Sequence, residues 1–212
     1  MAPMGRPVAE LSAAAAVDDA MVLAAVDRGD RDHALRLLMR AHGDDIFRFC
    51  ASKVGPDRAD DVHQTVFIEA HRDLPRFERR STLRTWLFGI ANHRCLDEIK
   101  IRGRRESKFL PVEDPGATDP SDDPTPFEHV SRDELRGLLE HCLEGLGPAA
   151  RDAVLLRYRD GFQFEEIAKI LRDAAGAGAG EEKAGTLQQR VARALRALRK
   201  CVERRLKSTE VP

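Results

Sequence analysis

Apolar residues recur every three or four positions along most of this chain, and this spacing restricts what the chain can fold into. The clearest stripe lies in residues 32–54, where the predicted core-facing residues are Leu35, Leu38, Met39, His42, Ile46 and Phe49. Such spacing places side chains on one face of an α-helix. No stretch shows a strand pattern, and only 5% of the residues are aromatic, which also disfavours sheets. The sequence therefore predicts an all-α protein.

The same pattern predicts two groups of helices. The first group covers residues 18–30, 32–54, 58–72 and 82–102, and the second covers residues 131–148, 148–161, 162–174 and 186–207. Gly55-Pro56 and Gly147-Pro148 break the helical pattern. Ser81 or Thr82 is expected to cap the helix that follows it.

A segment of different composition separates the two groups. Between Phe109 and Val130, five prolines alternate with six acidic residues, without Lys or Arg. Such a segment cannot bury enough apolar area to offset its ordering entropy, so we expect a flexible acidic, Pro-rich linker. The predicted organisation is a disordered lead (1–17), a small helical domain (18–106), the linker (107–130), a second small helical domain (131–207) with a Gly-rich insert (172–184), and a tail (208–212).

The net charge of −1 conceals two basic segments. Ten Lys or Arg and four Asp or Glu give residues 72–105 a charge of +6, and eight against two give residues 184–212 the same charge. The segments around them are acidic. This pattern is expected of two separate anion-binding surfaces.

Other chemistries find little support. The cysteines Cys50, Cys95, Cys142 and Cys201 have no metal-ligand spacing and are expected to be reduced thiols in the core. His63, Glu69, His71 and Asp73 are close in sequence but point in different directions on a helix, so we expect a solvated face and no metal site. We expect no catalytic residues and no cofactor. Without a membrane-length apolar run or a secretory signal, the chain is expected to be cytoplasmic and not inserted into a membrane.

The last two predicted helices have the order of a helix-turn-helix. The side-chain amides of Gln188 and Gln189 are suited to reading adenine edges, and Arg190 and Arg193 to binding phosphates. A solvated arginine face on a packing helix would explain the same charges. This helix alone leaves both readings open.

Two motif blocks resemble a known family. Residues 59–100, "ADDVHQTVFIEAHRDLPRFERRSTLRTWLFGIANHRCLDEIK", resemble region 2 of bacterial sigma factors of the sigma-70 family, extracytoplasmic-function group. "LGPAARDAVLLRYRDGFQFEEIAKIL" and "GTLQQRVARALRALRK", in residues 146–171 and 185–200, resemble region 4 of these sigma factors. The resemblance covers about Val26 to Leu206. It identifies residues 18–106 with region 2 and residues 131–207 with region 4.

The resemblance implies partners and site residues. Core RNA polymerase would be bound through the clamp helices of its largest subunit, by Asp60, Asp61 and Gln64, and through the flap of its second-largest subunit. Promoter DNA would be bound at the −35 element by Gln188, Gln189, Arg190 and Arg193. At the −10 element the implied residues are Phe77, Arg79, Arg80, Ser81, Arg84, Trp86, Asn92, His93 and Asp97. An anti-sigma factor is a further expected partner.

Three departures from the family accompany this resemblance. Many members have a glycine and an acid at the positions of Arg79 and Arg80, and often an asparagine at that of His93. The turn before residue 185 is unusually long, which raises two alternatives: the insert loops out while Leu187, Val191 and Leu195 dock on the preceding helix, or it regulates −35 recognition. Trp86 shares a helical face with Leu83 and Ile90, so we expect its indole in the core.

The sequence thus predicts a sigma factor that directs promoter-specific transcription initiation through the −10 and −35 elements, and not an enzyme. Two alternatives remain. One is a stand-alone helix-turn-helix regulator, which would bind specific DNA tightly without polymerase. The other is a helical protein-interaction adaptor, which would bind partners without affinity for DNA.

Overall fold

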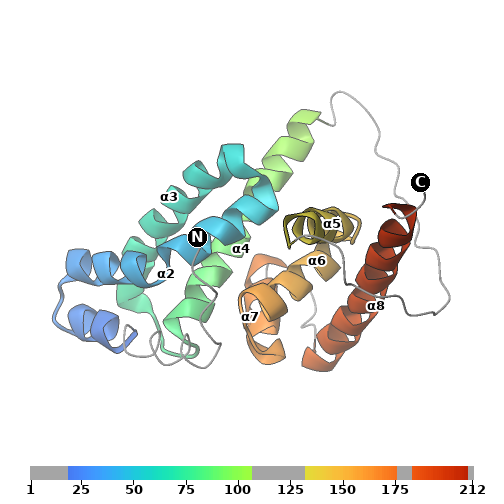
Figure 1. Ribbon diagram of the computed structural model, residues 1–212. Coiled ribbons are helices and arrows are strands. Elements are labelled where there is room, and N and C mark those ends of the chain that lie inside the picture. Colours follow the sequence, from blue (N-terminus) through green and yellow to red (C-terminus); the bar gives the residue numbers. More distant parts are fainter. Residues whose placement is uncertain (1–18, 107–131, 176–182, 210–212) are drawn as a thin grey trace. The chain divides into compact units, whose positions relative to one another are not determined.

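The computed structural model describes residues 19–106, 132–175 and 183–209. Within these ranges the chain forms helices and no strand (Figure 1). The all-α prediction is confirmed. The predicted lead, the linker and residues 176–182 of the Gly-rich insert lie outside the described residues. The described chain divides into two compact units.

The first unit is built from three long helices. They are α2 (Arg31–Val54), α3 (Pro56–Asp73) and α4 (Leu83–Glu106), and each packs on the other two (Figure 1). Gly55 ends α2 in a left-handed conformation, with φ 88°, which glycine adopts without steric cost. Pro56 then opens α3, where a missing backbone N–H is harmless.

Side chains fix the connection at the point where it enters α4. A 3₁₀ turn, Leu74–Arg76, follows α3. Thr82 caps α4, because its Oγ1 accepts a hydrogen bond of 3.1 Å from the Thr85 backbone N–H. Asp19, in a helical stretch over residues 19–27, accepts a second one of 3.1 Å from the Leu83 N–H. Its other carboxylate oxygen lies 3.3 Å from His42 Nε2.

The core of the first unit agrees with most of the predicted stripe. Leu38, His42, Ile46 and Phe49 are buried, and the rings of Phe49 and Phe88 lie 5.2 Å apart. Met39, however, is exposed, so its placement in the core was wrong. Met39 follows Leu38 directly, and the 100° rotation per residue carries it past the edge of the buried face.

The second unit is organised around the last helix. α8 (Ala184–Thr209) packs against α5 (Arg132–Glu144) and α6 (Pro148–Val154). A π-helical turn, Leu155–Arg159, follows α6, in which the Asp160 N–H donates to the Leu155 carbonyl. The prediction of one regular helix over 148–161 was wrong, because the α-helix ends at Val154 and continues as this wider turn. α7 (Phe164–Ala175) is divided: residues 164–167 group with this unit and residues 168–175 with the first.

One face of α8 is buried. The buried residues of this helix are Leu187, Val191, Ala194, Leu198 and Val202. Leu195 is exposed and was wrongly expected to dock. It lies one residue beyond the buried face, as Met39 does on α2.

The cysteines divide into two pairs, and one pair contradicts the prediction. Cys142 of α5 and Cys201 of α8 form a disulfide, with their Cα atoms 5.8 Å apart, a separation usual for such bonds. The two residues are 59 positions apart in sequence, so only the fold brings them together. Cys50 and Cys95 are free and buried, as expected.

Candidate nucleic-acid interface

The first implied contact surface is a polar face of α3. Asp60, Asp61 and Gln64 are all exposed, and a carboxylate oxygen of Asp61 lies 3.9 Å from the Arg58 guanidinium. Ile68 lies one turn beyond Gln64 and is 65% exposed. Sequence reasoning missed Ile68, although an apolar residue on a polar helix face was a signal for it. Together these four residues form a surface with an acidic end and an apolar end.

The loop before α4 holds the next group of implied residues. Phe77 is half-buried and its ring lies 5.2 Å from that of Trp86. Trp86 is itself half-buried, so the expected core position is only partly reached, while Leu83 is fully buried. The half-buried Ser81 donates a hydrogen bond of 3.2 Å to the Thr82 carbonyl. The aromatic pair therefore anchors the loop at one end.

Arg79 has an unusual backbone. Its φ is 58°, and among the described residues it is the sole non-glycine with a positive φ. This conformation costs an L-residue roughly 1 kcal/mol or more and is characteristic of functional loops. The Arg79 guanidinium forms an ion pair with Asp27, and the more exposed Arg80 forms one with Glu78. Arg79 thus adopts the left-handed conformation that glycine commonly adopts in turns, and it adds a cationic side chain to the loop.

Arg84 is held more firmly than the loop arginines. Its Nη2 lies 3.3 Å from Asp45 Oδ2, and its guanidinium carbon lies 5.1 Å from the centroid of the Phe88 ring. The side chain is 22% exposed. Arg84 therefore connects the buried core of the first unit to its surface.

Further along α4, the implied residues take part in a charged network. Arg94 donates hydrogen bonds to both carboxylate oxygens of Glu69 and one of 3.1 Å to Asp97. His93 Nδ1 lies 3.5 Å from the same Asp97 carboxylate. The hydrogen bond from Arg94 to Glu69 raises the pKa of Arg94 above its usual range. Glu69 was expected on a solvated face and is instead half-buried in this network.

Asn92 lies in a different environment from its neighbours. Its side chain is buried, and its Oδ1 accepts a hydrogen bond from Lys53 Nζ. The structure therefore brings Phe77, Arg80, Arg84 and Trp86 to the surface and leaves Asn92 beneath it.

The implied −35 residues lie in the first turns of α8. Gln188, Gln189 and Arg193 are exposed and Arg190 is half-buried. The buried Leu187 and Val191 alternate with them, so packing fixes which face of the helix the amides occupy.

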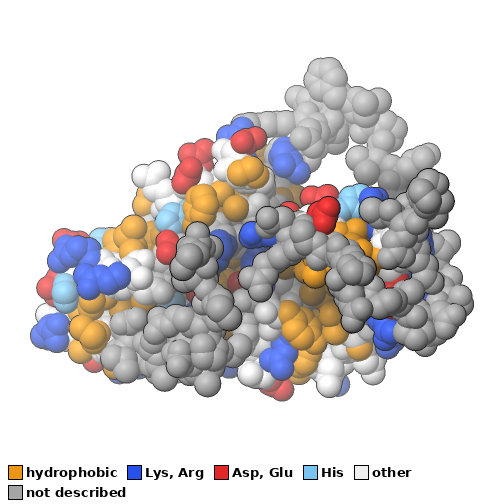
Figure 2. All heavy atoms as spheres, in the orientation of Figure 1, with side chains coloured by type: hydrophobic (Ala, Val, Ile, Leu, Met, Phe, Trp, Pro, Cys, Tyr) orange, Lys and Arg blue, Asp and Glu red, His pale blue; other side chains and the backbone are white. Residues whose placement is uncertain are grey.

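The face drawn in Figure 2 shows Lys and Arg side chains mixed with acidic ones, and apolar side chains reach the surface beside them.

Among the described residues, no three His, Cys, Asp or Glu side chains are grouped so as to hold a metal ion. His63 is half-buried, with Nε2 3.1 Å from the Gly43 carbonyl and its ring 5.0 Å from that of Phe67. No helix in the described ranges is long and apolar enough to span a bilayer.

Family models match both halves of the chain. Sigma-70 region 2 matches residues 38–105 and sigma-70 region 4 matches residues 136–198. The extracytoplasmic-function RNA polymerase sigma factor SigE of Mycolicibacterium smegmatis is 32% identical over 163 residues. This match covers 76% of the chain and 59% of the relative's length. The RNA polymerase sigma-H factor of Pseudomonas aeruginosa is 28% identical, and 87% of the chain and 94% of that protein are covered.

Solved structures share the fold. The sigma factor RpoE of Bartonella quintana, in complex with the anti-sigma factor NepR, matches with a TM-score of 0.59 and 23% identity, over 79% of this chain and 96% of that chain. CnrH, in complex with the cytosolic domain of CnrY, matches with a TM-score of 0.60 and 19% identity, over 88% and 97%. The matches to the two family models and to the sigma-factor relatives favour neither a stand-alone regulator nor an adaptor. With both regions present in family order, the chain belongs to the extracytoplasmic-function group of the sigma-70 family, the factors that direct RNA polymerase to promoters.

Proposed function

We propose that the chain binds core RNA polymerase and directs it to promoters by recognising a −10 element with the first unit and a −35 element with the second. The observation that carries this proposal is the order of the two regions, each with cationic or amide side chains on its surface. A sigma factor of this kind requires two DNA-binding surfaces on one chain, and the two basic segments supply them.

The polymerase contact is proposed for the surface of Asp60, Asp61, Gln64 and Ile68. Three polar side chains next to one exposed apolar side chain match the usual make-up of a protein interface, with a small apolar centre and a polar rim. The clamp helices of the largest subunit are the proposed partner. The second unit would in turn contact the flap of the second-largest subunit.

The −10 contacts are proposed for the loop from Phe77 to Ser81 and for Arg84, Trp86 and His93. Taking a base out of the stack costs a few kcal/mol, which phosphate contacts and stacking on aromatic side chains offset. The adjacent Phe77 and Trp86 rings provide stacking surface, and the exposed Arg80 of the same loop provides a positive charge. Asn92 and Asp97 are proposed to act indirectly, by positioning Lys53 and Arg94.

The −35 contacts are proposed for Gln188, Gln189, Arg190 and Arg193 at the start of α8. An amide can both donate to and accept from adenine in the major groove, and a good pair contributes about 1–3 kcal/mol of discrimination. The arginines would bind phosphates and give the binding its salt dependence.

Reconstitution with core polymerase tests the function. We expect initiation at a defined set of genomic promoters that share a −10 and a −35 sequence, measured by mapping the 5′ ends of transcripts. Specific DNA binding of equal strength without polymerase would instead indicate a stand-alone regulator. Partner binding without any DNA affinity would indicate an adaptor.

Matched charge variants test the residues. Arg193→Glu should weaken promoter binding by the holoenzyme on every sequence and lower the salt dependence by about one counterion per site. Arg36→Glu changes the net charge equally on an exposed position of α2 and should leave binding unchanged. Asp61→Arg should weaken the binding of core polymerase, with Asp44→Arg on α2 as its control. Equal effects of test and control variants would refute these assignments.

An anti-sigma factor is proposed as a further partner. Two solved relatives were each determined with a bound protein, in one case an anti-sigma factor. Tagged protein recovered from the source cells should carry a stoichiometric partner that core polymerase displaces. A partner that binds together with core polymerase would contradict this proposal.

A further inference from the structure

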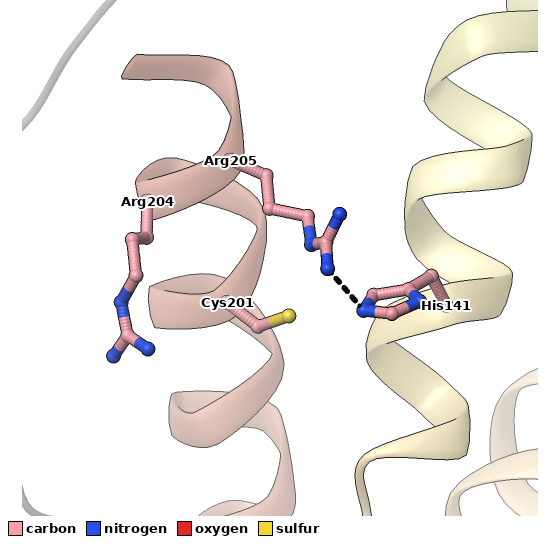
Figure 3. A pocket seen from close by; sticks show the side chains of 4 residues that line it. All are labelled: His141, Cys201, Arg204 and Arg205. Atoms are coloured by element: carbon pink, nitrogen blue, oxygen red, sulfur yellow. Dashed lines mark hydrogen bonds between the residues drawn. The ribbon is translucent and has the colours of Figure 1, made fainter. Parts of the chain in front are cut away.

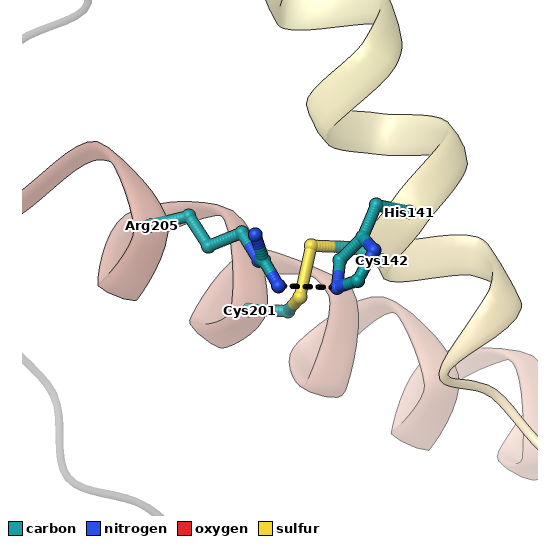
Figure 4. The surroundings of a disulfide bond; sticks show 4 residues. All are labelled: His141, Cys142, Cys201 and Arg205. Atoms are coloured by element: carbon teal, nitrogen blue, oxygen red, sulfur yellow. Dashed lines mark hydrogen bonds between the residues drawn. A yellow bond between two sulfur atoms is a disulfide. The ribbon is translucent and has the colours of Figure 1, made fainter. Parts of the chain in front are cut away.

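The disulfide between α5 and α8 borders a positively charged pocket. The pocket has a volume of ≈ 480 Å³ and is lined by His141, Cys201, Arg204 and Arg205 (Figure 3). Arg205 reaches across from α8 and donates a hydrogen bond to His141 Nε2, next to the two bonded sulfurs (Figure 4). All four residues belong to the second unit. The sulfur of Cys201 points toward the side of α8 that carries the Arg205 guanidinium, and Arg204 lines the same pocket from the other side (Figure 3).

The two sulfur atoms differ in access. Cys142 is only 3% exposed, whereas Cys201 is half-buried and lines the pocket. A small molecule entering the pocket meets the Cys201 sulfur. Thiol–disulfide exchange proceeds by attack of a thiolate on one sulfur, so its rate depends on access to that sulfur and on the local concentration of thiolate.

We propose that this pocket is a site of thiol–disulfide exchange with a small thiol that carries carboxylate groups. Arg204 and Arg205 supply the charge that attracts such an anion, and guanidinium groups match carboxylates in shape and charge. A thiol without carboxylates attacks as a thiolate with a single negative charge and gains less from these arginines. The pocket thus selects among small thiols by their charge.

The exchange takes two steps. The thiolate attacks Cys201 Sγ, the Cys142–Cys201 bond breaks, and Cys142 leaves as a thiolate that takes a proton from water. A second molecule of the same thiol attacks the sulfur bound to Cys201, releases the Cys201 thiolate and forms the oxidised dimer of the small thiol. Two small thiols are oxidised by two electrons in total, and the protein disulfide is reduced to two thiols.

Opening the bond changes how α5 is held. In the part of α5 whose side chains the structure describes, Cys142 is the one buried residue, and Leu135 and Leu139 are exposed. Cys142 is therefore the most buried attachment of α5, next to the half-buried Leu138 and Leu143, and reduction of the disulfide loosens this helix. If the chain acts in transcription as proposed above, it works among thiols that keep most cysteines reduced. Only this step depends on the proposed function.

Reduction kinetics of the purified full chain test the exchange site. Glutathione is the probe that carries carboxylates and 2-mercaptoethanol is the probe without them, and the two are compared at equal thiolate concentrations. Arg204→Gln/Arg205→Gln should slow reduction by glutathione about tenfold and slow reduction by 2-mercaptoethanol much less. Salt should slow the glutathione reaction of the wild type in the same selective way. Mass spectrometry of alkylated peptides measures the loss of the disulfide.

A matched control and a trapping variant complete the test. Arg196→Gln removes one exposed charge elsewhere on α8 and should change neither rate. Cys142→Ser should accumulate a mixed disulfide with oxidised glutathione on Cys201, and circular dichroism confirms that each variant is folded. Equal slowing with both thiols, or absence of a Cys142–Cys201 bond in the oxidised protein, would overturn the proposal. Because no polymerase or DNA is present, neither outcome bears on the proposed function.

Hydrogen exchange measures the consequence for α5. On reduction of the wild type, the amide hydrogens of α5 should exchange faster, while those of α2 and α4 keep their protection. Unchanged exchange in α5 after complete reduction would show that the bond does not hold this helix.

Discussion

The two compact units each bring a pair of cysteines together, but only one pair is bonded. Cys50 and Cys95 lie among the buried side chains of the first unit, and their mutual hydrogen bond, followed by burial, raises the pKa of the Cys50 thiol well above its ordinary range. Such a thiol is unreactive. Cys142 and Cys201 instead form a covalent bond beside a pocket.

The difference reflects how α5 is held, because the rest of the second unit has fully buried side chains of its own, such as Leu156, Phe162 and Leu187. The fully buried large side chains of the first unit include Leu38, Ile46, Phe49, Leu87 and Phe88. α5 of the second unit shows one buried residue among those whose side chains are described. A helix that buries so little contributes little stability by packing, and the cross-link compensates for it. The first unit is thus held by packing and the second partly by a covalent bond.

The largest expected effect comes from opening a cavity in the first unit. Phe49→Ala removes a fully buried ring in contact with Phe88 and should lower the free energy of unfolding of this unit by about 3–5 kcal/mol. Trp86, the single tryptophan of the chain, reports unfolding of the first unit by fluorescence in urea. Met39→Ala, at an exposed position, should cost less than about 0.5 kcal/mol. Equal losses in the two variants would contradict the assigned core.

The next largest effect should separate the units. Replacing both Cys142 and Cys201 with Ser should destabilise the second unit by about 2–4 kcal/mol, because the unfolded chain regains the freedom that the bond removes. Tyr158, the single tyrosine, reports this unit. A reductant added to the wild type should lower the urea midpoint of the tyrosine signal as the double substitution does. It should leave the midpoint of the Trp86 transition unchanged. A shift of the tryptophan transition would show that the two units unfold together.

A smaller loss of stability should distinguish an ion pair of the first unit from one of the second. Glu69 and Arg94 are 15% and 30% exposed and share two hydrogen bonds, so Glu69→Gln should cost about 1–2 kcal/mol, between the values for exposed and buried pairs. In α5, Glu140 pairs with the largely exposed Arg136. Glu140→Gln should change stability by less than about 0.5 kcal/mol. Urea denaturation measures both, and a larger loss for Glu140→Gln would reverse the comparison.

The sequence also predicted the two units unequally well. Periodicity located the helices and most of the core of the first unit, because burial of one helix face depends on local spacing. Met39 and Leu195 were misplaced because each directly follows a buried residue, where spacing alone does not define the edge of the face. The disulfide could not be predicted, because its cysteines are 59 residues apart and lack a recognisable spacing.

The implied site residues show the same limit. Motifs grouped Phe77, Arg80 and Trp86 in sequence, and in the structure the rings of Phe77 and Trp86 are in contact and Arg80 is exposed. They gave no sign that Asn92 is buried against Lys53, or that Glu69 is bound by Arg94. Partners from other helices decide these positions, and such partners do not show in a local pattern.

The smallest expected effect concerns acid stability at the end of α3. A hydrogen bond from Arg72 lowers the pKa of Asp73 below the ordinary value of 3.8. Because the folded pKa is the lower one, the unfolded chain takes up this proton first as the pH falls. The stabilisation is therefore complete above the ordinary pKa and is lost as the pH falls through the lowered folded value. Asp73→Asn removes this contribution, so urea midpoints followed by Trp86 should differ between variant and wild type at neutral pH and converge in acid. A difference that persists unchanged at the lowest pH would show that Asp73 stabilises the first unit by something other than its charge.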